Sequence, residues 1–156
     1  MELEEFDMIY KRLVVTRNYH RAFRICLNKL SDNVVAENAI AKIRELVEEH
    51  SCKVFEPYSN NYRLQVPFLL DSNWLLDIAI NLGYKEVEHA KISTGWFSSV
   101  PSIAIGSLLN KHRYGLSRNM KNNTTTIYYS ARCFCRDYKM ITAISEELIK
   151  LYSDRG

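Results

Sequence analysis

The stretch GLSRNMKNNTTTIYYSAR, Gly115 to Arg132, decides the fold of the C-terminal half of this 156-residue chain. It joins a strand-like GLSR to a returning strand, TTTIYYSAR, through the polar tip NMKNN. Strand-like segments on both sides of a polar, asparagine-rich tip are typical of a β-hairpin. The sequence therefore predicts an antiparallel hairpin with a solvated tip.

The hairpin lies inside a long segment without carboxylates. Between Glu88 and Asp137 there are 48 residues with no Asp or Glu, and they carry seven positive charges. These are Lys91, Lys111, Arg113, Arg118, Lys121, Arg132 and Arg136. Because the whole chain has a net charge of +3, the remainder carries −4. Such asymmetry is typical of a protein that offers one basic surface to a polyanion, and the alternative is chance clustering on a solvated face.

A second basic cluster, RNYHRAFRICLNK, runs from Arg17 to Lys29. Phe23, Cys26 and Leu30 recur near helical spacing, so the basic side chains are expected on the opposite, exposed face of a helix. Such a face contacts phosphate, an acidic partner or water. Acids in the preceding segment, MELEEFD, are available to pair with it.

Composition places the chain among folded globular proteins. Hydrophobic residues make up 47% and charged residues 25%, and the length suits a single domain over residues 1–156. We expect a helical part over 1–50 and an α+β part with the basic hairpin over 51–156. The N-terminus is acidic, unlike a secretory signal, and no apolar run approaches the roughly 20 residues of a membrane helix. These features favour a cytoplasmic protein with no membrane segment.

Hydrophobic periodicity predicts a helix-rich α+β fold with a small antiparallel sheet. Helices are expected up to Val15, over the basic cluster, from a cap at Asp32 to about His50, from Asp71 to Gly83, from Pro101 to Gly115, and from Asp137 onward. Strands are expected in a hairpin from CKVFEP to NYRLQVPF, in YKEVEHAKI, and from Thr124 to Cys135. Pro67 is expected to end the second strand of the first hairpin or to place it at a sheet edge.

The segment from Ser99 to Tyr129 orders a helix, IAIGSLLNKH, a break at Gly115 and then the basic hairpin. This order resembles the recognition helix and β-wing of a winged-helix DNA-binding domain of the phage and mobile-element type. Gly106, Leu109 and Gly115 match the family pattern GxxLxxxxxG. The resemblance implies a helix in the major groove that ends at Lys111, His112 and Arg113. It also implies a wing on the phosphates that carries Arg118, Lys121, Asn122 and Asn123.

Charge pattern and resemblance together predict a DNA- or RNA-binding protein of the phage or viral regulator type, acting in the host cytoplasm and without a cofactor. The expected nucleic-acid-binding residues are Lys111, His112, Arg113, Arg118, Lys121, Asn122, Asn123 and Arg132. Aromatic residues in the same segment are candidates for stacking on unpaired bases. They are Tyr114, Tyr128, Tyr129 and Phe134.

Two other functions stay open. Trp96 and Phe97 lie in the polar loop STGWFSSV, where aromatic side chains suit contact with a host or partner protein. Glu86 and Glu88 suit a small nuclease if they bind Mg²⁺ with Asp71 or Asp77, and His89 or His112 with Arg113 suit a metal-independent one. Cys133 and Cys135 supply only two zinc ligands, and Cys26 is expected to pack in the core.

Overall fold

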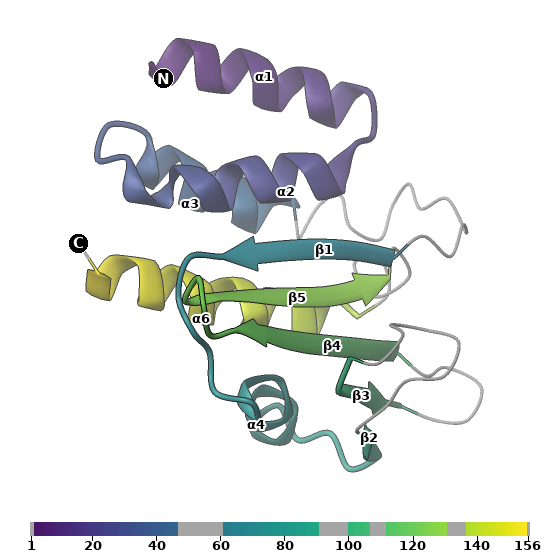
Figure 1. Ribbon diagram of the computed structural model, residues 1–156. Helices are drawn as coiled ribbons and strands as arrows, with labels where there is room; N and C mark the ends of the chain where they lie inside the picture. The colour runs from purple at the N-terminus through teal and green to yellow at the C-terminus, as the bar shows by residue number, and fades with distance from the viewer. Residues whose placement is uncertain (1, 47–60, 91–99, 107–111, 131–136, 156) are drawn as a thin grey trace. The chain divides into compact units, whose positions relative to one another are not determined.

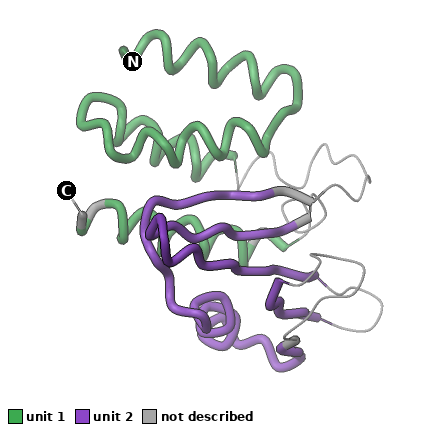
Figure 2. The backbone as a smooth tube through the Cα atoms, in the orientation of Figure 1, with its two compact units in different colours: residues 1–55, 134–156 green, residues 56–133 purple. Residues whose placement is uncertain are grey.

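The computed structural model describes residues 2–46, 61–90, 100–106, 112–130 and 137–155. Helices and one antiparallel sheet occur in it, which confirms the predicted α+β class (Figure 1). The chain divides into two compact units (Figure 2). Unit 1 comprises residues 1–55 and 134–156, and unit 2 comprises residues 56–133. Described helices of unit 1 come from both ends of the chain, and the sheet lies in unit 2.

Each described α-helix of unit 1 buries one apolar stripe. These helices are α1 (Leu3–Val15), α2 (Tyr19–Asn28), α3 (Ala36–Glu45) and α6 (Tyr138–Arg155). The short 3-10 helix η1 (Lys29–Ser31) follows α2 and has no buried residue. The largest fully buried side chains of the α-helices are Phe6, Phe23, Leu27, Ile43, Met140 and Ile141. Helices were expected from the sequence in all four α-helical regions, and the structure confirms them. None of the helices among the described residues is long and apolar enough to cross a lipid bilayer.

The third helix begins later than the sequence predicts. The Oδ1 atom of Asp32 accepts a hydrogen bond from the backbone N–H of Val34 at 2.9 Å, which forms a turn before the helix. The Asp32 carbonyl then accepts from Val35 and Ala36, and Val35 becomes the N-cap of α3. Asp32 therefore shapes the turn that leads into α3 and does not cap the helix itself.

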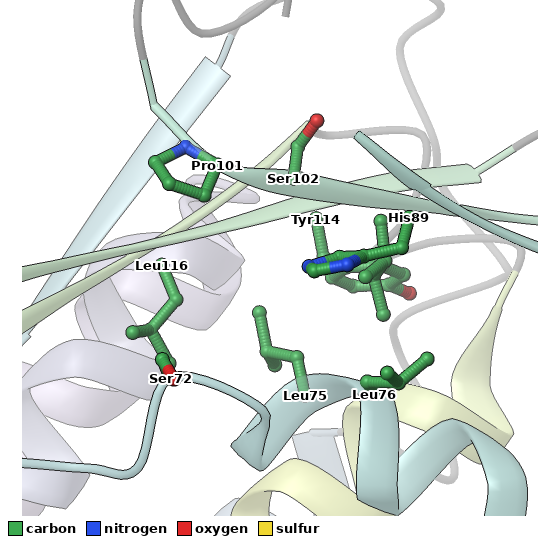
Figure 3. A pocket seen from close by; sticks show the side chains of 9 residues that line it. Ser72, Leu75, Leu76, His89, Pro101, Ser102, Tyr114 and Leu116 are labelled. Atoms are coloured by element: carbon green, nitrogen blue, oxygen red, sulfur yellow. The ribbon is translucent and has the colours of Figure 1, made fainter. Parts of the chain in front are cut away.

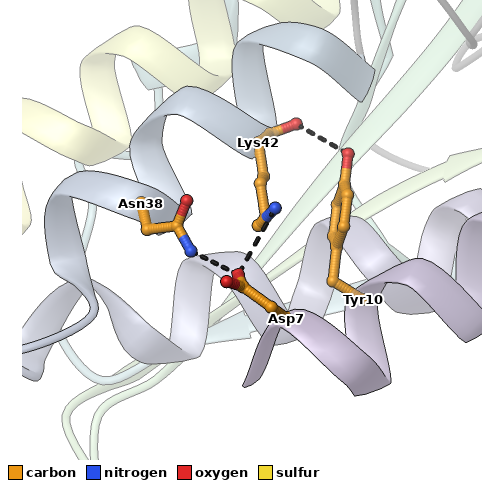
Figure 4. A network of polar contacts seen from close by, with 4 residues as sticks. All are labelled: Asp7, Tyr10, Asn38 and Lys42. Carbon is orange, nitrogen blue, oxygen red and sulfur yellow. Dashed lines mark hydrogen bonds and ion pairs between the residues drawn. The ribbon is translucent and has the colours of Figure 1, made fainter. Parts of the chain in front are cut away.

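A polar network joins α1 to α3 (Figure 4). Asp7 on α1 accepts a hydrogen bond from the side chain of Asn38 and lies 3.4 Å from the Nζ atom of Lys42. That ammonium group also lies 4.4 Å from the centre of the Tyr10 ring, and the Tyr10 hydroxyl donates to the Lys42 carbonyl at 3.4 Å. The Lys42 side chain is only 19% exposed, so its charge depends on these contacts for compensation.

We predict that Asp7→Ala lowers the free energy of unfolding by about 1–2 kcal/mol, because it removes the carboxylate partner of a mostly buried ammonium group. The exposed Lys11→Ala change on the same helix is the matched control and should alter it by less than about 0.5 kcal/mol. Urea unfolding of both variants measures the difference. Equal stability of the two variants would contradict the structural role of the network.

Burial shifts the pKa of two side chains on α2. It lowers the pKa of His20 to about 4, with a smaller contribution from the nearby charge of Arg24. It also raises the pKa of the Cys26 thiol to about 12, and Cys26 is fully buried. The expected packing role of Cys26 is thus confirmed. A protonated, buried thiol of this kind is chemically inert.

The His20 shift predicts acid sensitivity. Because the folded-state pKa is lower than the ordinary value of 6.5, the unfolded chain takes up a proton first as the pH falls from 6.5 to about 4. Protonation of His20 should therefore lower the free energy of unfolding by about 2–3 kcal/mol as the pH falls through this range. Urea unfolding at several pH values checks this, and His20→Gln should lose less stability than the wild type between the same limits. Parallel pH profiles for the two proteins would show that His20 is not responsible.

Unit 2 is an antiparallel sheet with one described helix. Its strands are β1 (Asn61–Val66), β2 (Val87–Ala90), β3 (Ser102–Ile105), β4 (His112–Asn119) and β5 (Thr124–Ser130), in the spatial order β1-β5-β4-β3-β2. Helix α4 (Trp74–Asn81) contacts β2, β3 and β4. The helix ends before Gly83, whose φ of +82° suits glycine, as predicted.

The structure also confirms the expected edge position of β1, which ends just before Pro67. A short strand in YKEVEHAKI is confirmed as β2. The first strand of the hairpin expected from CKVFEP lies outside the described residues. The first described strand of unit 2 is thus β1. It pairs with β5, which lies about 60 positions later in the chain.

The helix expected from Pro101 to Gly115 is wrong in both of its described parts. Ser102–Ile105 form β3, and β4 runs from His112 through Gly115. All four residues of β3 are buried. In so short a segment, without exposed residues, no alternation of apolar and polar side chains distinguishes a strand from a helix. These residues therefore do not form the recognition helix that the winged-helix resemblance implies. Residues 107–111 lie outside the described part of the chain.

Candidate nucleic-acid interface

The predicted hairpin of β4 and β5 is confirmed, and its tip is held by asparagines. The strands pair in register to Asn119 and Thr124, which leaves a four-residue connection. The Oδ1 atom of Asn119 accepts hydrogen bonds from the backbone N–H groups of Lys121 at 3.1 Å and Asn122 at 3.2 Å. Asn123 has a φ of 54°, a left-handed conformation that asparagine tolerates. The asparagines in this sequence therefore shape the turn.

We predict that Asn119→Ala destabilises the hairpin, because it removes the acceptor of two backbone hydrogen bonds. The expected loss in free energy of unfolding is about 1 kcal/mol, with faster amide exchange at Lys121 and Asn122. Asn122→Ala, at an exposed position of the same turn, is the control and should have a smaller effect. If both substitutions leave amide exchange unchanged, the side chain of Asn119 does not hold the turn.

Strands β1, β5 and β4 have one buried face and one polar face. Side chains on the buried face include Leu64, Leu116, Ile127, Tyr114 and Tyr129. Helix α4 covers part of this face, since Leu75 lines a shallow pocket together with Tyr114 and Leu116 (Figure 3). The alternate residues form what we call the open face, which consists of Arg63, Gln65, Arg113, Ser117, Thr126 and Tyr128. Arg63 and Gln65 are exposed, and the others are half-buried.

The hairpin tip, residues 118–123, contains most of the described residues that the sequence predicts to bind nucleic acid. Arg118, Lys121, Asn122 and Asn123 are all exposed there. Neither Arg118 nor Lys121 has a carboxylate partner among the described residues. Two flexible cations are thus presented to solvent at one end of the sheet. A short, exposed turn of this kind can approach a phosphate backbone without rearrangement of the fold.

The neighbouring candidates Arg113 and His112 point to opposite faces of β4. Arg113 belongs to the open face, where its Nη1 atom donates a hydrogen bond to the Ser102 hydroxyl at 3.1 Å. His112 is paired with Ile105 and is half-buried on the face that carries Tyr114. The structure therefore places Arg113 with the open face and separates His112 from it.

Several nominated residues lie outside the described part of the chain. They are Lys111, Arg132, Trp96, Phe97, Phe134, Cys133 and Cys135. The described residues of the interface are therefore those of the open face and of the hairpin tip.

Sequence reasoning missed Ser117 and Thr126 on the hairpin strands of the open face, and it also missed Arg63 and Gln65. The latter two come from β1, whose antiparallel pairing with β5 places Arg63 opposite Tyr128 and Gln65 opposite Thr126. The alternation in NYRLQV indicates that the two side chains share a face, but no local pattern indicates which strand lies beside them. The Arg63 guanidinium lies 5.6 Å from the centre of the Tyr128 ring, a cation–π geometry.

The electrostatics of this region follow from its composition. Strands β1 and β4, the hairpin tip and β5 together contain no Asp or Glu. They carry four formal positive charges, on Arg63, Arg113, Arg118 and Lys121. Acidic Glu88 is on β2 and shares this face of the sheet, because the register aligns it with Ala104 on β3 and with Arg113 on β4. The three neighbouring strands and the tip thus carry charge of one sign, with Arg63 and Arg113 on the open face and Arg118 on the side of Leu116. Charge of this sign attracts a polyanion.

Burial distinguishes the aromatic residues that could stack on a base from those that could not. Tyr114 and Tyr129 are 0% and 1% exposed, so neither can contact a ligand without unfolding. Tyr128 lies between Ile127 and Tyr129 in β5 and therefore points to the other side of the sheet. Among the described tyrosines proposed for stacking, Tyr128 alone is accessible from the open face.

The described residues do not assemble the catalytic alternatives. They contain no group of three His, Cys, Asp or Glu side chains that could hold a metal ion, so Glu86 and Glu88 do not join Asp71 or Asp77 in a magnesium site. His89 lines the shallow pocket beside α4, together with Leu75 and other mainly apolar side chains (Figure 3). This pocket offers His89 no carboxylate among its lining residues.

Comparison of the chain with known protein families, with characterised proteins and with solved structures finds no match. The open face and the hairpin tip, through their geometry and charge, are therefore the features of this chain that point to a function.

Proposed function

We propose that this protein binds nucleic acid through the hairpin tip and the open face of strands β1, β5 and β4. One observation carries the proposal: three adjacent strands and their connecting tip have four positive charges and no carboxylate. Nucleic acids are the polyanions that such a surface fits best, because their phosphates repeat at short intervals along a chain. The proposed function is binding, with a regulatory role.

The two parts of the surface contribute differently. Arg118 and Lys121 are exposed and have no described carboxylate partner, so they are available to contact phosphates and release counterions. Asn122 and Asn123 add amide groups that hydrogen-bond to phosphate oxygens or base edges. Arg113 is held by Ser102, which fixes its position on the open face. These differences support a nucleic-acid contact in which the tip is exposed and the side chains of the sheet are already in position.

The proposal differs from the winged-helix arrangement in one respect. A helix in the major groove is not part of it, because the described residues expected to form that helix are in strands β3 and β4. The hairpin itself still suits contact with the phosphate backbone. No observation on the described residues favours the partner-binding loop at Trp96 and Phe97 or a nuclease site over nucleic-acid binding.

We predict that Arg118→Ala combined with Lys121→Ala weakens binding to labelled DNA and RNA at least tenfold at about 50 mM salt, because two phosphate contacts are lost. The slope of log K against log salt should also become shallower by about 1–2. Fluorescence polarisation across a salt series measures both quantities. The matched control is Lys85→Ala with Lys139→Ala, which removes the same charge from two exposed positions outside the surface.

The control variant should bind as the wild type does, apart from a small general effect of net charge. The proposal is wrong if the wild type shows no salt-dependent binding to any nucleic acid. It is also wrong if the two double variants lose the same affinity, since binding would then depend on total charge and not on this surface. Circular dichroism confirms that each variant is folded before binding is compared.

A further inference from the structure

We infer that the nucleic acid recognised by this protein is single-stranded, and that one of its unpaired bases stacks at Tyr128 on the open face. The inference rests on the proposed function and assigns a ligand class to the same surface. Two rows of residues cross β1, β5 and β4 on this face and support it.

The first row consists of Arg63 on β1, Tyr128 on β5 and Gly115 on β4, which lie directly opposite one another in the register. Gly115 is buried and adds no side chain, so the row offers one half-buried aromatic ring and one exposed guanidinium. Both groups are planar, and the guanidinium is 5.6 Å from the ring centre. Planar aromatic and guanidinium groups are the ones on which nucleobases stack, since every base has a π-face.

The second row consists of Gln65, Thr126 and Ser117, again directly opposite one another. All three side chains can donate and accept hydrogen bonds. This row lies two residues along each strand from the first, about 7 Å away. A base stacked on the first row would therefore have hydrogen-bonding partners for its edge, or for the adjoining phosphate, within reach on the second.

Charge and shape select a single strand over a duplex. The side chains of this face lie on a sheet and do not form a projecting helix or ribbon that could enter a groove. In a duplex the base faces are also covered by their neighbours in the stack. A single strand presents both its phosphates and its base faces to the surface.

The position of Tyr128 supports a binding role for its ring. The residues on either side of it, Ile127 and Tyr129, are 0% and 1% exposed and supply the packing of β5. Tyr128 points the other way, next to the Arg63 guanidinium and toward the part of the sheet face that β1, β5 and β4 form, which has no carboxylate. Because Tyr114 and Tyr129 are buried, stacking by the described tyrosines of this segment depends on Tyr128. One substitution therefore tests the inference.

The test compares 12-nucleotide single-stranded RNA, single-stranded DNA and duplex DNA of one sequence by fluorescence polarisation, with the wild type, Tyr128→Ala and Tyr128→Phe. We expect the wild type to bind a single strand at least tenfold more tightly than the duplex. Tyr128→Ala should weaken single-strand binding about tenfold or more and leave duplex binding within twofold. Tyr128→Phe, which keeps the ring, should bind like the wild type. Preference for RNA or for DNA identifies the source of the strand, and either preference supports the inference.

A second measurement needs no variant and so avoids any effect of Tyr128 on folding. Single-stranded oligonucleotides that carry 2-aminopurine should lose fluorescence on binding the wild-type protein, because stacking quenches this base. Unchanged fluorescence at saturation, or a duplex bound as tightly as the single strands, would overturn the inference. If the duplex binds and Arg118→Ala with Lys121→Ala abolishes that binding, the proposed function stands without it. Absence of binding to all three nucleic acids would overturn both.

Discussion

Strand β5 forms hydrogen-bonded pairs on both of its sides, with β1 and with β4, and the rest of the candidate interface depends on this pairing. A shift of one residue in either register would exchange the buried and the open face, because strand side chains alternate with a period of two. The hydroxyl of Thr125 opposes such a shift. It donates to the carbonyl of Phe68 at 2.8 Å and accepts from the N–H of Leu70 at 2.9 Å, at a fully buried position.

Once the register is set, the burial of two tyrosines and one isoleucine determines which groups remain for a ligand. Ile127 and Tyr129 fill the core side of β5, and Tyr114 fills the core side of β4. Tyr128 and Arg113 then lie on the opposite side with Arg63. The buried side chains therefore fix the positions of the residues on the open face. Most of the conformational entropy cost of ordering this surface is met when the protein folds, before a ligand binds.

The elements that could be predicted from sequence are those with a strong local signal. The stripes of α1, α2 and α6, the glycine after α4 and the polar tip of the hairpin each occupy a few neighbouring residues, and all were confirmed. Strand β3 gave no such signal, because all four of its residues are buried and its apolar run fits a helix equally well. The pairing of β1 with β5 joins residues about 60 positions apart, which no local pattern encodes.

The same distinction applies to the interface. The net charge of the hairpin is a property of composition and was visible in the sequence. Its division between faces was not, because it depends on strand geometry: adjacent His112 and Arg113 point to opposite sides of β4. Arg63 was missed for a related reason, since it reaches the surface from a distant part of the chain.

The central claim is that the open face and the hairpin tip together contact a nucleic acid. The most direct test is an NMR titration of the ¹⁵N-labelled 18.3 kDa protein with a short single-stranded oligonucleotide. The account predicts that amide shifts change with the oligonucleotide concentration at residues 63–65, 113–123 and 126–128, and that those of α1 and α2 stay constant. Changes confined to the basic helix α2, or the absence of any change, would contradict it.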